Sequence, residues 1–368
     1  MLHFAIMNVT ANTQDKYRLR IVFWETTTAC NLSCRHCRRQ DTAPESALQD
    51  LTTKESLNLI EDVKQAGRPL LILSGGEPLL RKDLFTLVDY ARERDIPLAL
   101  ATNGTCIDKS IAVRIRDSGI RRVSVSLDGA DARIHDQFRG IPGAFERAIQ
   151  GIRLLIQQGI STQINFTLAR HNAGQMEQMF TLASALHVDA LHLFLLVPVG
   201  CGLEIAPAEM LTSTEYEKLL RRFHILSRDY RSSFETRATC APHYYRIISQ
   251  MREDNPGSAD DTHNITSTHP HHGSRGCLAG INVCFISHRG EVFPCGYLPV
   301  SSGNIRTRSL AEIWNESTIF KQLRDYSLLK GKCGKCRFVD VCGGCRARAF
   351  AYSGDYLAEE PYCIYTPS

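Results

Sequence analysis

The chain has 368 residues, of which 43% are hydrophobic and 22% are charged, and its formal net charge is +4 at pH 7. This composition is that of an ordinary globular protein with a sizeable core, and the length suggests two domains. The small net charge, without a basic stripe interleaved with aromatics, argues against a nucleic-acid partner. Because the N-terminal segment does not read as a signal peptide and no apolar run is long enough to span a bilayer, we expect a cytoplasmic protein without a membrane partner.

Short β-rich runs alternate with helical patterns between about residues 19 and 199. Residues 53–67 and 145–159 carry apolar side chains at three- and four-residue spacing and end at glycine, as helices often do. Strands that alternate with helices pair in parallel through right-handed crossovers. The pattern predicts an α/β fold, a partial (β/α)6 barrel with fewer units than the eight of a closed TIM barrel. Its strands begin at Ile21, Pro69, Pro97, Arg122, Gln163 and Ala190.

Four short motifs follow the first four predicted strands. In chain order they are "TTACNLSCRHC", "SGGEP", "TNG" and "SLDG". Active groups of α/β barrels lie at the C-terminal ends of the strands, which share one rim. We therefore expect these motifs to meet in a single site.

We divide the chain into four parts by composition. Residues 252–275 are polar and rich in Gly, Pro, Ser, Thr and His, as in a linker. His269, His271 and His272 could bind a metal ion, although a solvated loop is the simpler interpretation. The expected parts are an N-terminal tail (1–18), the barrel (19–200), a helical connection with the polar linker (201–275) and a cysteine-rich module (276–368).

The 14 cysteines are grouped, which in a reducing compartment indicates metal sites rather than disulfides. The first group, Cys30, Cys34 and Cys37, is one thiol short of a closed four-ligand site. Three thiolates can hold a [4Fe–4S] cluster and leave one iron open for a small chelating molecule. A structural zinc site is the alternative, but it needs a fourth ligand, and the adjacent His36 is poorly placed to supply it.

"CNLSCRHC" has the spacing C-x3-C-x2-C with His36 in the usual aromatic position, and "GGEP" follows the second predicted strand. These motifs resemble the signature of the radical S-adenosylmethionine (SAM) superfamily, and the resemblance covers nearly the whole chain. It implies that the open iron of a [4Fe–4S] cluster binds the amino and carboxylate groups of SAM. An electron from the cluster then cleaves the carbon–sulfur bond, giving methionine and a 5′-deoxyadenosyl radical.

The resemblance also implies SAM-binding residues. The glycines of GGEP let the backbone approach the methionine end of SAM, and Glu77 accepts a charge-assisted bond from its ammonium group. Arg139 is a candidate partner for the SAM carboxylate, or else a surface arginine. Polar residues at strand ends are candidates for the ribose, or only turn formers. The full expected set is His36, Gly75, Gly76, Glu77, Pro78, Ser126, Asp128, Arg139 and Asn165.

Eight further cysteines follow residue 276 and resemble the SPASM extension of radical SAM enzymes, which carries auxiliary iron–sulfur clusters. The resemblance implies two auxiliary [4Fe–4S] clusters, although the last spacing is C-x2-C where C-x3-C is usual, which bears on Cys345. Zinc held by "CGKC" and "CGGC" is the alternative. Cys240 is either a substrate-side or redox thiol or a buried inert one. The implied ligand sets are Cys277, Cys284, Cys295 and Cys345, and Cys333, Cys336, Cys342 and Cys363.

Three longer stretches resemble the heme b synthases (AhbD-type) of the siroheme-dependent heme pathway: "ALHLFLLVPVGCG", "TRATCAPHYYRI" and "CFISHRGEVFPCGYLPV" together with the tail from Cys342. The resemblance implies oxidative decarboxylation of two propionates of iron-coproporphyrin III to vinyl groups. It also implies an external electron donor and acceptor of the ferredoxin or flavodoxin type. Alternatives are a related porphyrin-modifying enzyme (a didecarboxysiroheme deacetylase or a heme d1 biosynthesis enzyme), a peptide-modifying radical SAM/SPASM enzyme, and a noncatalytic iron–sulfur or zinc protein.

A porphyrin with several carboxylates needs cationic anchors, for which arginine is suited. For each candidate a structural role is the alternative. The candidates for substrate contact are Arg237, His243, Tyr244, Tyr245, Arg246, Arg346 and Arg348.

Overall fold

The computed structural model describes residues 17–39, 44–254 and 276–367. The expected N-terminal tail and polar linker, with His269, His271 and His272, lie largely or wholly outside the described residues. Along the described parts of the chain, none of the helices combines the length and apolar character that crossing a membrane requires.

A ten-stranded sheet forms the centre of the molecule, in the order β10-β9-β8-β1-β2-β3-β4-β5-β6-β7. The strands from β1 to β7 all pair in parallel, which confirms the predicted α/β barrel. The six predicted strands are β1 (Ile21–Glu25), β2 (Leu70–Ser74), β3 (Leu98–Thr102), β4 (Arg122–Ser126), β5 (Thr162–Leu168) and β6 (Ala190–Leu195).

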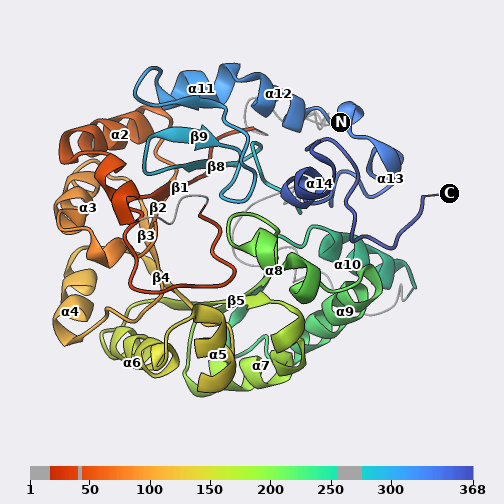
Figure 1. Cartoon of the computed structure of the whole chain (residues 1–368), viewed down its shortest axis with the longest axis horizontal. Helices are drawn as coiled ribbons and strands as arrows, with labels where there is room; N and C mark the ends of the chain where they lie inside the picture. Colours follow the sequence, from red (N-terminus) through yellow and green to blue (C-terminus); the bar gives the residue numbers. More distant parts are fainter. Residues whose placement is uncertain (1–16, 40–43, 255–275, 368) are drawn as a thin grey trace, which may run out of the picture.

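Helices cover the outer face of the sheet (Figure 1). The two helices predicted from periodicity are present, and each ends two residues before its glycine. Gly67 and Gly159 have φ values of +101° and +70°, a backbone region that favours glycine. The helices of the barrel are α2 (Thr53–Gln65), α3 (Leu84–Arg92), α4 (Lys109–Asp117), α5 (Ala132–Arg139), α6 (Ala144–Gln157), α7 (Met176–Ala185), α8 (Gly202–Glu209), α9 (Ser213–Asp229) and α10 (His243–Asp254).

The two faces of the barrel strands differ in polarity. Val22 and Trp24 of β1, and Val123 and Val125 of β4, are fully buried in the core between sheet and helices. Because side chains alternate along a strand, the intervening positions point into the barrel. On β4 and β5 these inward positions include serine and asparagine, whereas a parallel sheet packed on both faces is apolar throughout. The interior is therefore polar enough for a ligand.

Four strands, β7 to β10, were not predicted, and two of them extend the barrel sheet directly. β7 (Glu235–Thr239) lies in the part expected to be helical and pairs with β6. β8 (Val283–Ile286) comes from the cysteine-rich module and pairs in parallel with β1, so the module shares the sheet of the barrel. The remaining elements are η1 (Pro44–Gln49), η2 (Pro78–Leu80), η3 (Arg170–Gln175), β9 (Glu291–Phe293), β10 (Gly303–Asn304), α11 (Leu310–Glu316), α12 (Thr318–Arg324), η4 (Tyr326–Leu328), α13 (Gly331–Gly334) and α14 (Arg346–Ser353).

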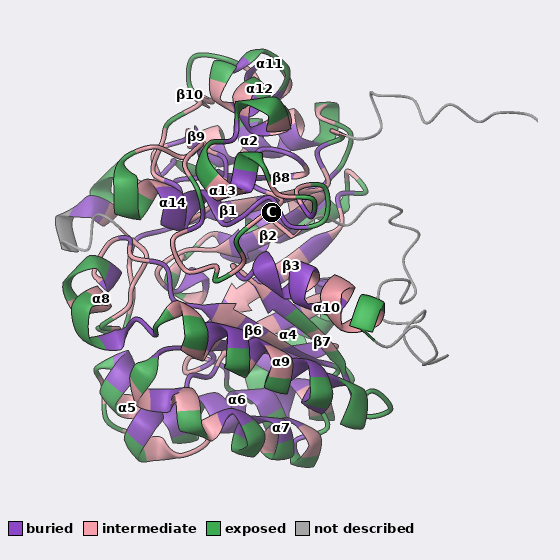
Figure 2. Ribbon diagram, turned by 90° about the vertical axis from the view of Figure 1, so that its right-hand side faces the viewer, coloured by how far each residue is buried: buried purple, intermediate pink, exposed green. Residues whose placement is uncertain are grey.

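Exposed surface lies mainly on the outer helices, whereas the strands of the barrel are mostly buried or half-buried (Figure 2). The figure also shows α8 and α14 on the same side of the molecule, in line with their places around the barrel mouth in Figure 1. Cys201 N, just before α8, donates to Cys37 O at 2.9 Å, so the loop that carries the first three cysteines lies on that side.

Candidate active site

The loop after β1 places Cys30, Cys34 and Cys37 close to one another. The pKa of the Cys34 thiol is raised to about 11, chiefly by burial; Arg139 opposes the rise, and the neighbouring Cys37 and Cys30 contribute to it. Arg139 Nη1 donates to Cys34 Sγ at 3.7 Å, and Arg39 Nε donates to Cys37 Sγ at 3.3 Å. A metal centre deprotonates its thiol ligands, and N–H donors to sulfur tune an iron–sulfur cluster. The three thiols therefore fit the predicted cluster.

The cysteine loop rests directly on the GGEP turn after β2. Gly76 N donates to Thr27 O at 2.7 Å, and Glu77 N donates to Ala29 O at 2.8 Å. A Cβ on Gly75 would lie 2.6 Å from Thr27 O, and one on Gly76 would collide with Ala29 O. The structure thus requires glycine here for contact with the cysteine loop, and the expected approach of the backbone to SAM stays a prediction.

Glu77 is fully buried and engaged within the protein. Its carboxylate accepts from Thr102 Oγ1 at 2.8 and 2.9 Å, from Asn103 N at 2.8 Å and from Leu79 N at 3.1 Å. Burial raises the pKa of Glu77 despite these bonds. The carboxylate thus ties the ends of β2 and β3 together, with Pro78 buried at the start of η2. Contact of Glu77 with the SAM ammonium stays a prediction.

Asp128, just after β4, joins two other predicted residues. Its carboxylate lies 2.6 Å from Arg139 Nη2 and 3.1 Å from His36 Nε2. Burial alone would raise the pKa of Asp128, but Arg139 and His36 hold it well below its usual range. The His36 ring stacks on Phe138, with centroids 3.9 Å apart. Arg139 is therefore no surface residue: it links Asp128 to Cys34, and its proposed bond to the SAM carboxylate stays untested.

Ser126 and Asn165 are neighbours across β4 and β5, both half-buried on the inner face near the rim. Asn165 accepts from Gln163 Nε2 at 2.6 Å and lies opposite His192 of β6. These residues form a polar row inside the barrel. Their contact with a ribose stays a prediction.

Sequence reasoning missed an asparagine bridge between the cysteine loop and the end of β3. Asn103 Nδ2 donates to Asn31 Oδ1 at 2.9 Å, and Asn31 Nδ2 donates to Thr105 Oγ1 at 2.8 Å. The sequence predicts that the "TNG" motif lies at the rim, but only the fold shows that it contacts the cysteine loop. Together with Asp128 and Glu77, this bridge confirms that the four motifs share one rim.

Arg39 and Arg38 were also missed, although both directly follow the last cysteine of the loop. Arg39 Nη1 donates to Thr28 O and so closes the loop on itself. The Arg38 guanidinium lies 4.4 Å from the ring centroid of Phe285 on β8 and 3.9 Å from Glu25 of β1. It stands where the barrel meets the cysteine-rich module.

One predicted set of auxiliary ligands is assembled in the C-terminal module. Burial raises the pKa of the Cys342 thiol, and Cys363 and Cys333 add to the rise. Cys363 in turn contributes to the raised pKa of Cys336, again after burial. Each of the four sulfurs also accepts a hydrogen bond. Cys333 Sγ accepts from Arg346 Nη2 and Glu360 N, and Cys336 Sγ accepts from Phe338 N. Cys342 Sγ accepts from Gly344 N, and Cys363 Sγ accepts from Arg246 Nη2. The four thiols fit a cluster.

The second predicted set is only partly assembled. Cys277 and Cys345 both raise the pKa of Cys295, after the larger effect of burial, so these three thiols are neighbours. Cys284 instead lies in the main hydrophobic core. Among the described residues no three His, Cys, Asp or Glu side chains are arranged around a single metal ion.

The predicted substrate residues lie on three elements, β7, α10 and α14, and their contact with a substrate stays a prediction. Arg348 is paired with Glu360 at 3.0 Å, and Arg246 with Glu217 at 2.5 Å. Arg346 donates to three backbone carbonyls, those of Gly344, Tyr356 and Ala358. These three guanidinium groups are engaged internally, which favours the structural alternative for each.

The other four predicted substrate residues differ in exposure. Arg237 is exposed on β7, and Tyr245 is half-buried against Tyr244. Tyr244 is buried, with its hydroxyl 3.3 Å from His224 Nδ1. His243 is fully buried without a hydrogen-bond partner in the described structure, and burial lowers its pKa to about 3.

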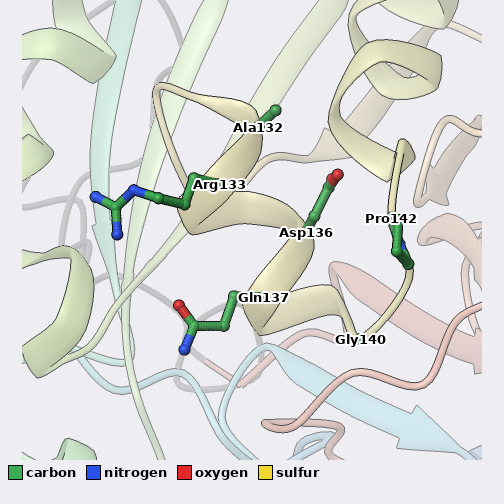
Figure 3. A pocket seen from close by; sticks show the side chains of 6 residues that line it. All are labelled: Ala132, Arg133, Asp136, Gln137, Gly140 and Pro142. Atoms are coloured by element: carbon green, nitrogen blue, oxygen red, sulfur yellow. The ribbon is translucent and has the colours of Figure 1, made fainter.

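A hollow of about 520 Å³ lies on the outside of α5 (Figure 3). Its lining residues, Ala132, Arg133, Asp136, Gln137, Gly140 and Pro142, include none of the cysteines or predicted cofactor residues. Gly140 packs against Ser33 of the cysteine loop, so the hollow lies behind that loop.

A polar barrel that presents three thiols at its mouth and is joined to a cysteine-rich module defines a radical SAM enzyme with a SPASM extension. Residues 24–183 match the Radical SAM superfamily model, and residues 277–346 match the iron–sulfur cluster-binding SPASM domain. Such domains imply a SAM-binding [4Fe–4S] cluster and auxiliary iron–sulfur clusters. In fold, the chain is similar to SuiB of Streptococcus suis bound to its precursor peptide, with a TM-score of 0.74, 16% identity and coverage of 95% of this chain and 76% of SuiB.

The sequence is 45% identical to an "AdoMet-dependent heme synthase" of Methanosarcina barkeri, over 95% of this chain and 97% of the relative. It is 29% identical to the "Fe-coproporphyrin III synthase" of the same organism, over 96% and 89%. The chain therefore belongs to the family of AdoMet-dependent heme synthases within the radical SAM superfamily. The resemblance read from the sequence is confirmed.

The contact between the cysteine loop and GGEP yields a first prediction. In Gly76→Ala the new Cβ would lie 2.6 Å from Thr28 O and closer still to Ala29 O, so the loop must move. We expect a loss of about 1–3 kcal/mol of unfolding free energy and weaker iron binding at the first cluster. Denaturant unfolding of the iron-free chain and iron content after anaerobic reconstitution measure the two effects.

Gly174→Ala is the matched control, because nothing lies within 4 Å of a Cβ at Gly174. Wild-type stability and iron content in Gly76→Ala would contradict the close packing of the loop on this turn.

Proposed function

We propose that this protein is a heme b synthase that oxidatively decarboxylates two propionate side chains of iron-coproporphyrin III to vinyl groups. The observation that carries the proposal is the full-length similarity to a heme synthase, which exceeds the similarity to the Fe-coproporphyrin III synthase of the same organism. A porphyrin-modifying relative and a peptide-modifying enzyme remain the alternatives that the experiment below separates.

Cys30, Cys34 and Cys37 would hold the cluster that binds SAM, at the mouth of the barrel. When bound, the cluster and SAM supply a 5′-deoxyadenosyl radical that takes a hydrogen atom from the substrate. The chain's own part is to hold the three thiols rigidly. The GGEP turn fixes the loop through its backbone, and the Asp128–Arg139 pair fixes it from the side of β4.

The electron balance requires redox partners. Each propionate loses a hydrogen atom and carbon dioxide, and one electron is left over when the vinyl double bond forms. One electron also enters for each SAM cleaved. We propose that an external donor and acceptor of the ferredoxin or flavodoxin type exchange these electrons, and that the protein works in the cytoplasm, where its 14 free cysteines stay reduced.

Arg38 is our candidate for anchoring a substrate carboxylate in place of the internally paired arginines. It lies between the ends of β1 and β2 and the module: its Nη2 is 3.5 Å from Ser74 Oγ, and its guanidinium faces Phe285. Its nearest carboxylate, Glu25, is 3.9 Å away and is itself bound to His288 Nδ1 at 3.1 Å. A substrate propionate would give Arg38 the short, bidentate bonds that these partners do not.

The reaction is tested by anaerobic incubation of the reduced, reconstituted protein with SAM and iron-coproporphyrin III. We expect mass spectrometry to detect a porphyrin that has lost two carbon dioxide molecules and four hydrogen atoms, two for each side chain, together with 5′-deoxyadenosine. Cys34→Ala should form neither product, because it removes one of the three cluster ligands. An unchanged porphyrin in the presence of SAM cleavage would contradict the proposal and favour the alternatives.

The metal content tests the cofactor assignment. After anaerobic reconstitution we expect about twelve irons per chain, four for each cluster. Iron for one cluster together with stoichiometric zinc would contradict the two auxiliary clusters and favour the alternative in which CGKC and CGGC bind zinc.

The role of Arg38 is tested by Arg38→Ala. Loss of a charge-assisted bond to carboxylate should weaken binding of iron-coproporphyrin III roughly tenfold to a hundredfold. SAM cleavage without porphyrin should stay at the wild-type rate. Porphyrin binding followed by absorbance titration measures the effect, with Arg116→Ala on the exposed surface of α4 as control. Equal affinities in both variants would remove Arg38 from the substrate site.

A further inference from the structure

We infer that Cys240, and not Cys284, completes the ligand set of one auxiliary cluster together with Cys277, Cys295 and Cys345. Cys240 lies outside the stretch matched by the SPASM domain, residues 277–346. The inference rests on the auxiliary clusters of the proposed function, but it does not depend on which substrate the enzyme converts.

Cys284 faces the wrong side of the sheet for this cluster. On β8 it is the register partner of Val22, and both side chains are fully buried in the core under the helices. The next residue, Phe285, points to the opposite face, as alternation along a strand requires. There it contacts Arg38 and would meet a Cβ placed on Gly296, the neighbour of Cys295.

The electrostatic surroundings of Cys284 agree with this placement. Burial raises the pKa of its thiol far above the usual range, and the charged group that acts on it is Arg324. No cysteine of the described residues is among the groups that shift this pKa. A small apolar-packed thiol of this kind is an ordinary core residue.

Cys240 stands at the end of β7, on the side where the other three cysteines gather. It packs, with Cys295, against a small apolar cluster that contains Cys345. The chain after Cys240 also meets the start of the module, since a Cβ on Gly276 would lie 2.7 Å from Pro242 Cα. Cys277 directly follows that contact.

The four thiols also act on one another. Burial raises the pKa of Cys240 well above its ordinary value, and Cys345, Cys295 and Cys277 raise it further. Burial likewise raises the pKa of Cys295 to about 12, with contributions from Cys277 and Cys345. These mutual effects require short distances between the thiols, and a [4Fe–4S] cluster needs four cysteines gathered in this way, one at each iron.

A buried ion pair braces two of these cysteines from behind. Arg348 Nη1 donates to Cys240 O, and Arg348 Nε and Nη2 donate to Glu360 at 3.0 Å each. Glu360 in turn accepts from Cys345 N at 2.8 Å. Cys240 has φ +54°, an uncommon value for a residue other than glycine, and the bond to Arg348 helps to hold it.

The test compares Cys240→Ala with Cys284→Val in the full chain after anaerobic reconstitution. Iron and acid-labile sulfide per chain and the electron paramagnetic resonance (EPR) spectrum of the reduced protein are measured. We expect Cys240→Ala to lose up to about four of twelve irons and one auxiliary EPR signal. Cys284→Val should keep both, because valine suits the apolar core around it. Unchanged iron and EPR in Cys240→Ala, or an equal loss in Cys284→Val, would overturn the assignment.

Cys240→Ser distinguishes the loss of a cluster ligand from a folding defect. Its oxygen keeps nearly the volume of the thiol and can still bind iron, so a ligand at this position should retain iron but shift the auxiliary EPR signal. An unshifted signal at wild-type iron content would overturn the assignment. Because none of these measurements uses a porphyrin, failure of the heme synthase proposal would leave the result interpretable.

Discussion

Direct backbone contact between the loop after β1 and the turn after β2 is the constraint on which the site depends. Two N–H groups of GGEP bond to carbonyls of the loop, and glycine is required because a Cβ would occupy the same space. Backbone contacts of this kind leave little freedom to the three cysteines that the loop carries. A cluster bound by only three thiols needs such rigidity, because no fourth protein ligand helps to hold it.

Buried ion pairs then fix the cysteine-bearing segments from outside. Asp128 with Arg139 supports the loop after β1, Arg348 with Glu360 supports Cys345, and Arg246 with Glu217 lies beside Cys363. A buried ion pair is costly to desolvate and is maintained only with good geometry and further hydrogen bonds. Here each arginine also donates to a sulfur or a backbone carbonyl beside a cysteine. These arginines therefore support the cysteine-bearing segments.

The shared sheet explains how distant parts of the chain meet at the barrel mouth. β8 adds to the free side of β1, and β7 adds to the free side of β6, so the module and the segment before it lie at the two ends of the barrel sheet. Cys240 follows β7 and Cys295 follows β9, and the two meet in one small apolar cluster. The segments that follow these added strands therefore bring two auxiliary thiols together from opposite ends of the sheet.

The six barrel strands, the two amphipathic helices, the common rim of four motifs and the family could all be predicted from the sequence. These depend on periodicity, on short local spacings and on the rule that parallel strands share a C-terminal edge. β7 was not predicted because its sequence, "ETRAT", is short and polar. It forms a strand through its pairing with β6. Three features could be read only from the folded structure: Cys284 lies in the hydrophobic core, Cys240 packs beside Cys295, and Arg348 forms an ion pair with Glu360. Each of these depends on which face of a strand a residue occupies or on a partner far along the chain, and neither is encoded in local spacing.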